Sequence, residues 1–138
     1  MQETYMRRAI ELAKKGIGAV NPNPLVGAVI VKDGRIIGEG YHRRYGELHA
    51  ERDAFAHLTE DAAGAEMYVT LEPCQMCAGA IVQSRMKEVV IGCMNPKAGC
   101  AGSILNILQM KQFNHQVDIT RGSSGTGGTL TMIGGVIG

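Results

Sequence analysis

Three residues with metal-ligating side chains, His49, Cys74 and Cys77, constrain the fold of this 138-residue chain more than any other feature. Two cysteines separated by two residues can both face one ion from the first turn of a helix, and a histidine from another element can supply a third ligand. Zinc binds thiolate sulfur and imidazole nitrogen in tetrahedral geometry, and a site with three protein ligands keeps its fourth position for water. The chain must therefore bring two distant segments together, and the open position is typical of a catalytic zinc site.

Glu51 lies two residues after the histidine, near the metal but pointing differently from the ligand. A carboxylate there can accept a proton from water and pass it on, which makes Glu51 an acid and base rather than a ligand. The order His-x-Glu followed by Pro-Cys-x-x-Cys is the signature of zinc-dependent nucleobase deaminases. Zinc lowers the pKa of its bound water toward ~7. The pattern predicts hydrolytic deamination of a heterocycle, in which Glu51 protonates the ring nitrogen and helps ammonia leave.

The four cysteines leave other interpretations open. Cys93 or Cys100 could supply a fourth ligand and complete a structural zinc site, and the chain could be a zinc-stabilised binding module without activity. The four thiols could also form two disulfides. The Cys-x-x-Cys spacing beside His-x-Glu favours zinc in a reducing compartment, which is the cytoplasm by default. A carboxylate beside the metal has no use in a structural site, and this favours the catalytic interpretation.

The composition limits the class of protein but does not indicate a function. The length fits one domain with an adequate core. The 14 basic and 13 acidic residues nearly cancel, so net charge indicates no nucleic-acid partner, although a local basic patch would not appear in the sum. No apolar run reaches the ~20 residues of a membrane span, so we expect no membrane association.

Helical and strand patterns alternate along the chain. Met6, Ala9, Ile10 and Ala13 have helical spacing, and the Asp33-Gly34 pair predicts a hairpin turn. Strands are predicted at 26–31, 35–40, 66–71, 87–92 and 116–120, and later helices at 49–58, 73–84 and 103–109. The predicted fold is an α/β three-layer sandwich, with a five-stranded mixed sheet between helices. It ends at residue 121, and the Gly-rich segment 122–138 is expected to be a disordered tail, or less readily to add a strand at 129–133.

From residue 6 to 122 the chain resembles the cytidine deaminase-like superfamily. Segments 73–85, 95–103 and 113–117 resemble the bacterial tRNA-specific adenosine deaminases. This resemblance implies the favoured substrate, the wobble adenosine of a tRNA anticodon, which is flipped into the pocket and converted to inosine. Segments 21–31, 40–42 and 45–47 instead resemble the pyrimidine deaminase domain of the riboflavin biosynthesis enzyme. They imply the alternative, a small nucleotide-like substrate such as a phosphoribosylated diaminopyrimidinone.

Both resemblances have departures. The two-residue gap between Cys74 and Cys77 lacks the insertion of the riboflavin family, and His42 stands where the tRNA family has an asparagine that contacts the base. Asn23 and His42 together suit a nucleotide-like ligand and are the expected substrate contacts. Both families imply a homodimer or larger homo-oligomer. Cations that share the face of the pocket mouth would indicate RNA, whereas scattered cations would indicate a small substrate. Two or three cations lining a closed pocket would instead indicate a single phosphate. The cations concerned are Arg43, Arg44, Arg85, Lys87, Lys97 and Lys111.

Overall fold

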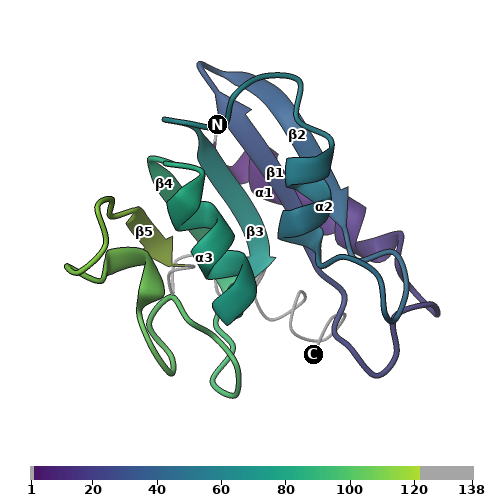
Figure 1. Cartoon of the computed structure of the whole chain (residues 1–138). Helices are drawn as coiled ribbons and strands as arrows, with labels where there is room; N and C mark the ends of the chain where they lie inside the picture. Colours follow the sequence, from purple (N-terminus) through teal and green to yellow (C-terminus); the bar gives the residue numbers. More distant parts are fainter. Residues whose placement is uncertain (1, 122–138) are drawn as a thin grey trace.

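A mixed five-stranded sheet forms the centre of the molecule (Figure 1). The computed structural model describes residues 2–121, so the predicted tail at 122–138 lies outside the described residues. The elements in chain order are α1 (Gln2–Lys14), β1 (Gly27–Lys32), β2 (Arg35–Tyr41), α2 (Ala50–Ala56), β3 (Glu66–Leu71), α3 (Gln75–Gln83), β4 (Glu88–Cys93), a short 3₁₀ turn (Ile107–Gln109) and β5 (Asp118–Arg121). Within the described residues, no helix is long and apolar enough to cross a membrane.

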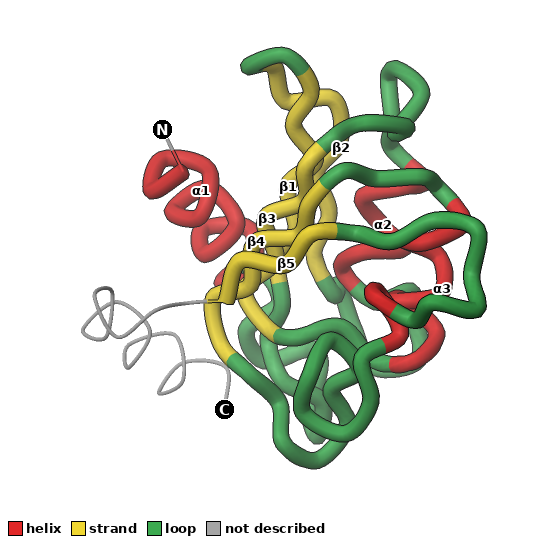
Figure 2. The backbone as a smooth tube through the Cα atoms, turned by 90° about the vertical axis from the view of Figure 1, so that its left-hand side faces the viewer, coloured by secondary structure: helices red, strands yellow, loops and turns green. Residues whose placement is uncertain are grey.

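The strand order is β2-β1-β3-β4-β5. β1 pairs antiparallel with both β2 and β3, whereas β3, β4 and β5 run parallel. Parallel neighbours need a crossover, and α3 provides it between β3 and β4. Figure 2 shows α1 alone on one side of the sheet, with α2 and α3 on the other. The predicted three-layer arrangement around a mixed sheet is confirmed.

The core follows from the two-residue period of the strands. In β1, Ala28 and Ile30 belong to the cluster that packs against α2 and α3, while Val29 and Val31 pack against α1. In α1, the spacing of Ala9 and Leu12 gives one buried face toward the sheet. The same alternation places Met67, Val69, Val89 and Ile91 on the first face and Tyr68 and Val90 on the second.

One predicted element is wrong. The segment 103–109 contains no α-helix, and only Ile107–Gln109 forms a 3₁₀ turn. The backbone amide and hydroxyl of Ser103 both donate to the carboxylate of Glu72, so Ser103 is committed to a distant partner instead of starting a helix. The last strand also begins two residues later than predicted, at Asp118.

The segments that carry the predicted site meet at one end of the sheet. β1 begins at Gly27, opposite the end of β2 at Tyr41, and the ends of the parallel strands β3 and β4 pair as Leu71 with Cys93. The helices α2 and α3 begin near this end (Figure 1). α2 approaches β2 closely at Gly40, where a Cβ atom would lie 2.3 Å from the backbone nitrogen of Ala54. The loops at this end therefore surround two helix N-termini.

Candidate active site and zinc centre

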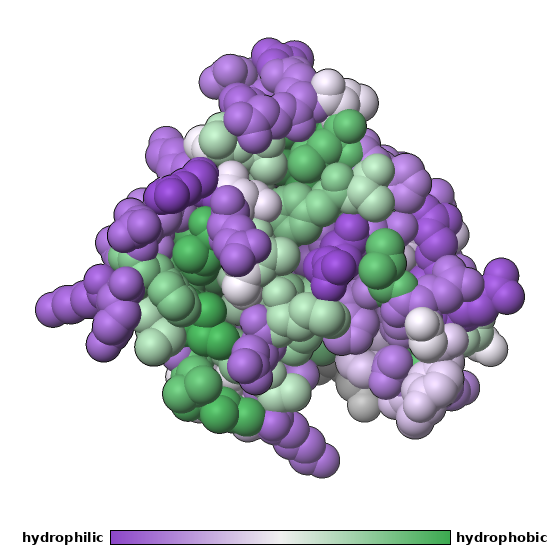
Figure 3. Space-filling view, viewed as in Figure 1, coloured by the Kyte–Doolittle hydropathy of each residue, from purple (hydrophilic) through white to green (hydrophobic). Residues whose placement is uncertain are grey.

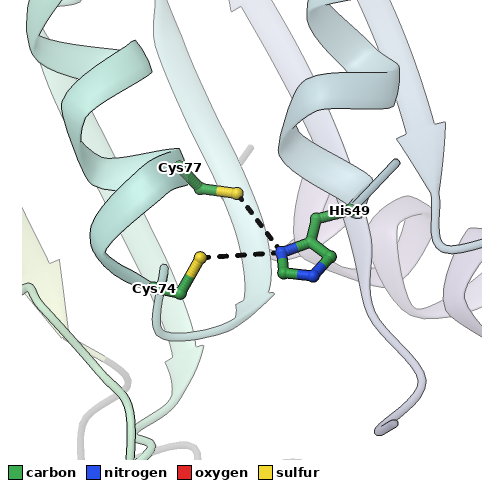
Figure 4. Close-up of side chains that lie close together, drawn as sticks. All are labelled: His49, Cys74 and Cys77. Carbon is green, nitrogen blue, oxygen red and sulfur yellow. Dashed lines mark hydrogen bonds between the residues drawn. The ribbon is translucent and has the colours of Figure 1, made fainter. Parts of the chain in front are cut away.

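The three predicted ligands come together as the sequence requires. His49 is the N-cap of α2, Cys74 is the N-cap of α3, and Cys77 lies in the first turn of α3. The Sγ atoms of Cys74 and Cys77 each lie 3.6 Å from Nδ1 of His49 (Figure 4). All three ligand atoms lie within 4.8 Å of one another.

These distances fit zinc. Bonds of about 2.3 Å to sulfur and 2.0–2.1 Å to nitrogen at a tetrahedral angle place the two atoms roughly 3.6 Å apart. Within residues 2–121, the metal-ligand cluster contains neither Cys93 nor Cys100, so no fourth protein ligand completes a structural site. All four cysteines are free thiols, which excludes the disulfide interpretation for this structure. The donor set is that of a three-ligand zinc site with an open position.

The cysteine pair is already partly prepared for a cation. The hydrogen bond from Cys77, with further help from the Cys77 backbone amide and His49, lowers the pKa of Cys74 to about 4 despite burial. The same hydrogen bond, in which Cys77 is the donor, together with desolvation raises the pKa of Cys77. The pair therefore favours a single negative charge, on Cys74. A zinc ion held by both sulfur atoms would require both thiolates and would displace the proton of Cys77.

Glu51 lies in the first turn of α2 and is only 4% exposed. Desolvation by this burial raises the pKa of its carboxyl group to about 7. A group with a pKa near the working pH can both accept and return a proton. Glu51 also lines the pocket beside His49 and Cys74, in the position that the sequence predicts for the acid and base.

A pocket of about 170 Å³ leads to the ligands. Asn23, Pro24, Val26, His42, His49, Ala50, Glu51, Leu71, Glu72, Cys74, Asn95 and Ala98 line it. It adjoins a groove of about 990 Å³ formed by the 17–25 loop and the segment after β4, with which it shares Asn23 and Asn95. The site is therefore a narrow pocket that contains the reactive groups beside a wider groove.

The structure brings Asn23 and His42 together in the pocket wall. Nδ1 of His42 donates to the carbonyl oxygen of Leu48 (3.0 Å), which leaves Nε2 to accept from Nδ2 of Asn23 (3.1 Å). The ring of His42 is buried and meets the ring of His49 edge to face at 5.5 Å. Both nitrogens of His42 are thus occupied, and His42 orients Asn23, whose Oδ1 atom is not used in this contact.

Sequence reasoning missed two buried acids. Asp53 on α2 accepts from the backbone amide of Tyr41 and pairs with Arg43, which fixes the loop that delivers His42 and His49. Glu72 follows β3 and accepts hydrogen bonds from the segment after β4. The sequence signal for Glu72 is an acidic residue between an apolar strand and a proline. The sequence does not show which groups donate hydrogen bonds to it.

Burial on its own raises the pKa of Glu72, but the hydrogen bonds from Ser103, Asn95 and Ala101 outweigh it and lower the pKa. The carboxylate is therefore held in its charged form. It lines the same pocket as Glu51, whose pKa moves in the opposite direction because desolvation outweighs the hydrogen bonds that it receives. The two acids beside Cys74 therefore favour opposite protonation states.

A family model described as the cytidine and deoxycytidylate deaminase zinc-binding region matches residues 1–93, more than half of the chain. The match includes His49, Glu51, Cys74 and Cys77. The chain belongs to this family. Deaminases of the family are hydrolytic enzymes that act on carbon–nitrogen bonds, and zinc is the cofactor that the donor set fits.

Two kinds of relative are similar to this deaminase-family chain. A riboflavin biosynthesis protein RibD of Actinobacillus pleuropneumoniae is 50% identical over 119 residues, which are 82% of this chain but 31% of that protein. A tRNA-specific adenosine deaminase of Bacillus subtilis is 40% identical over 129 residues, 87% of this chain and 79% of that protein. A diaminohydroxyphosphoribosylamino-pyrimidine deaminase of Buchnera aphidicola is 40% identical over 121 residues, 83% and 82% of the two chains.

The crystal structure of a bifunctional diaminohydroxyphosphoribosylaminopyrimidine deaminase and reductase of Thermotoga maritima has a TM-score of 0.79 and 44% identity. It covers 96% of this chain, which spans 38% of that protein. The likeness confirms the cytidine deaminase-like fold. The two groups of relatives are about equally close, so similarity alone does not choose the substrate.

Proposed function

We propose that the chain is a zinc-dependent hydrolytic deaminase of a nucleobase-like ring. The observation that supports this most is a three-ligand zinc site with the buried carboxyl group of Glu51 beside it in one pocket. Zinc, when bound, lowers the pKa of water toward ~7. Glu51 accepts a proton from that water and protonates the ring nitrogen next to the amino-bearing carbon. Water supplies the oxygen of the product, the carbon–nitrogen bond breaks, and the amine leaves as ammonia.

For the substrate class, we propose a small nucleotide-like molecule with one phosphate, in preference to an RNA strand. RNA binding requires several cations along one path, whereas the described residues place no cation in the pocket lining and a single one in the groove lining. Arg43 pairs with Asp53, Arg44 pairs with Glu47, and Lys87 lies at the opposite end of β4 from the pocket. Lys97 alone among the described cations lines the groove. The Gly-rich segment 122–138 contains no lysine or arginine.

The orientation of Asn23 supports the same choice. His42 accepts one hydrogen of the Asn23 amide, so the second hydrogen and Oδ1 are available to a donor and acceptor pair on a heterocycle. The pair formed by Asn23 and His42 belongs to the N-terminal half, which resembles the riboflavin-pathway deaminases. Asn23 is therefore the proposed substrate contact, and His42 acts through it.

A second candidate is deamination of the wobble adenosine in tRNA. The two-residue spacing of Cys74 and Cys77 favours it, as does the match to 79% of a tRNA-specific adenosine deaminase. Ammonia release by the zinc-loaded protein distinguishes the candidates. The compounds to compare are an anticodon stem-loop with a wobble adenosine, the phosphoribosylated diaminopyrimidinone, and free cytosine, adenine and guanine nucleosides. Activity on the mononucleotide alone supports the first candidate, activity on the stem-loop alone supports the second, and no activity contradicts both.

Lys97 tests the single-phosphate proposal. Replacing Lys97 by alanine is expected to raise KM for the phosphorylated substrate roughly tenfold, because one charge-assisted hydrogen bond is lost. KM for the same compound without its phosphate should not change. Lys111→Ala removes a cation outside the pocket and groove and serves as the matched control. Equal effects of Lys97→Ala on both compounds would contradict a phosphate contact.

We also propose that the protein forms a homodimer, or a larger homo-oligomer, in the reducing cytoplasm. Hydrophobic side chains gather over α3 and the segment between β4 and β5 (Figure 3). The exposed members are Met76, Ile104, Leu105, Met110 and Phe113. Exposed apolar patches of this kind commonly mark protein interfaces. Sedimentation velocity should give a dimer or larger species, and Met76→Lys should shift it toward the monomer; a wild-type monomer at all concentrations would contradict the proposal.

A further inference from the structure

Glu72 holds one wall of the pocket with a single carboxylate. Its Oε1 accepts from the backbone amide of Asn95 (2.9 Å) and from the hydroxyl of Ser103. Its Oε2 accepts from the backbone amides of Ala101 (2.8 Å) and Ser103 (2.9 Å). The side chain is 3% exposed, so these four donors replace water completely. All of them belong to residues 95–103, which we name the wall segment.

The wall segment faces the substrate space. Asn95 and Ala98 line the pocket, and Lys97 lines the groove. The segment has little regular structure, and Glu72 supplies the acceptors that a helix or strand would otherwise provide. It also packs closely, since a Cβ atom at Gly99 would lie 2.2 Å from the carboxyl carbon of Glu72. Glu72 is therefore a main anchor of this wall, beside the hydrogen bond that Arg121 donates to the carbonyl of Ala101 (2.7 Å).

The zinc ligands and Glu51 are held by other elements. His49 and Glu51 lie at the N-terminus of α2, and Cys74 and Cys77 at that of α3, whereas none of the donors to Glu72 lies on either helix. The wall segment is tied to the zinc side at one further point, the hydrogen bond from the amide of Cys100 to the carbonyl of Pro73 (2.8 Å). A movement of the wall segment should therefore alter how the substrate fits the pocket more than it alters the positions of the zinc ligands and Glu51.

We infer that Glu72 is a positioning residue that sets substrate affinity by holding the wall segment against the pocket. The inference rests on the proposed deaminase function and extends it to a residue that does not touch the reacting atoms. Replacing Glu72 by glutamine leaves at least one of the buried backbone amides without an acceptor, because an amide has only one oxygen. The wall segment then moves, while the zinc centre stays.

The test uses zinc-loaded Glu72→Gln with the substrate that the wild type deaminates most efficiently in the comparison above. KM is expected to rise at least roughly tenfold, with kcat within about threefold of wild type and zinc at one per chain. Glu60→Gln, an exposed acid paired with Arg35, is the matched control and should leave both constants unchanged. A fall in kcat or in zinc content without the rise in KM overturns the inference.

Ser103→Ala provides a second variant that is more certain to fold. It removes only the hydroxyl donor, so KM should rise by roughly threefold, and Glu72→Gln/Ser103→Ala should be no worse than Glu72→Gln alone. Additive effects overturn the inference. Hydrogen exchange tests the role of Glu72 without relying on deaminase activity. The amides of Asn95, Ala101 and Ser103 should exchange faster in Glu72→Gln, while those of β3 should exchange as in the wild type. If wild type deaminates no compound, the proposed function fails, and unchanged exchange at these amides would overturn the role of Glu72 as well.

Discussion

Glu51→Gln is expected to lower kcat by about 10²–10⁴-fold while zinc content stays at one per chain. Glutamine keeps the shape of the buried side chain but cannot accept or return a proton. Burial raises the pKa of Glu51 to about 7, so the wild-type carboxyl group exchanges its proton readily at neutral pH. Because His49, Cys74 and Cys77 form the ligand set without it, the metal should remain bound.

The measurement is kcat with metal analysis on the same samples. Glu51→Ala should also retain zinc and fold, with turnover abolished. Glu47→Gln, an exposed acid that pairs with Arg44, is the matched control and should retain wild-type activity. Loss of zinc in Glu51→Gln would contradict the assigned role, because it would make Glu51 part of the metal site. Full activity would show that another group transfers the proton.

Removal of zinc is expected to abolish ammonia release and to destabilise the fold, with both effects reversed by added zinc. Chelation leaves the half-buried Cys74 and the buried Cys77 without the ion that would join them, at the point where α2 and α3 begin. Free zinc at 1,000 times its Kd should stabilise the folded state by about 4 kcal/mol, as measured by urea unfolding. Both results together would show that the metal serves folding as well as chemistry.

Single ligand variants sharpen this prediction. Cys74→Ser and His49→Ala should each bind less than about a tenth of the wild-type zinc, since a two-ligand site is left. Cys93→Ser is the control for a cysteine outside the cluster, and it should keep its zinc. A Cys93→Ser protein without zinc would mean that Cys93 is a fourth ligand, which would restore the structural interpretation of the site.

The sequence predicted those parts of the structure that depend on local patterns. The two-residue alternation around Ala28 and Ile30 marks a buried strand, and the spacing of Cys74 and Cys77 marks a helix start, so the sheet and the zinc ligands are predictable from the sequence alone. Family resemblance then supplied His42 and Asn23. Each of these features has a sequence pattern that spans only a few neighbouring residues.

The remaining features depend on contacts between distant segments. Glu72 accepts from amides 23 to 31 residues later, and backbone donors carry no sequence signal of their own. The predicted helix at 103–109 is wrong for the same reason. Ser103 donates a hydrogen bond to Glu72 instead of to a group in its own segment. The sequence predicts that His42 contacts the substrate, but it could not show that Leu48 and Asn23 occupy both ring nitrogens.

Hydrolytic deamination itself is tested most directly by isotope transfer. The zinc-loaded wild type is incubated with the phosphoribosylated diaminopyrimidinone and with the anticodon stem-loop in ¹⁸O-enriched water, and ammonia and product are quantified together. The proposed chemistry predicts one ammonia released for each oxo product, with the solvent label at the carbon that carried the amino group, and both formed about 10²–10⁴-fold more slowly in Glu51→Gln. A protein with one zinc per chain that releases no ammonia from either compound, or a product without the label, would contradict it.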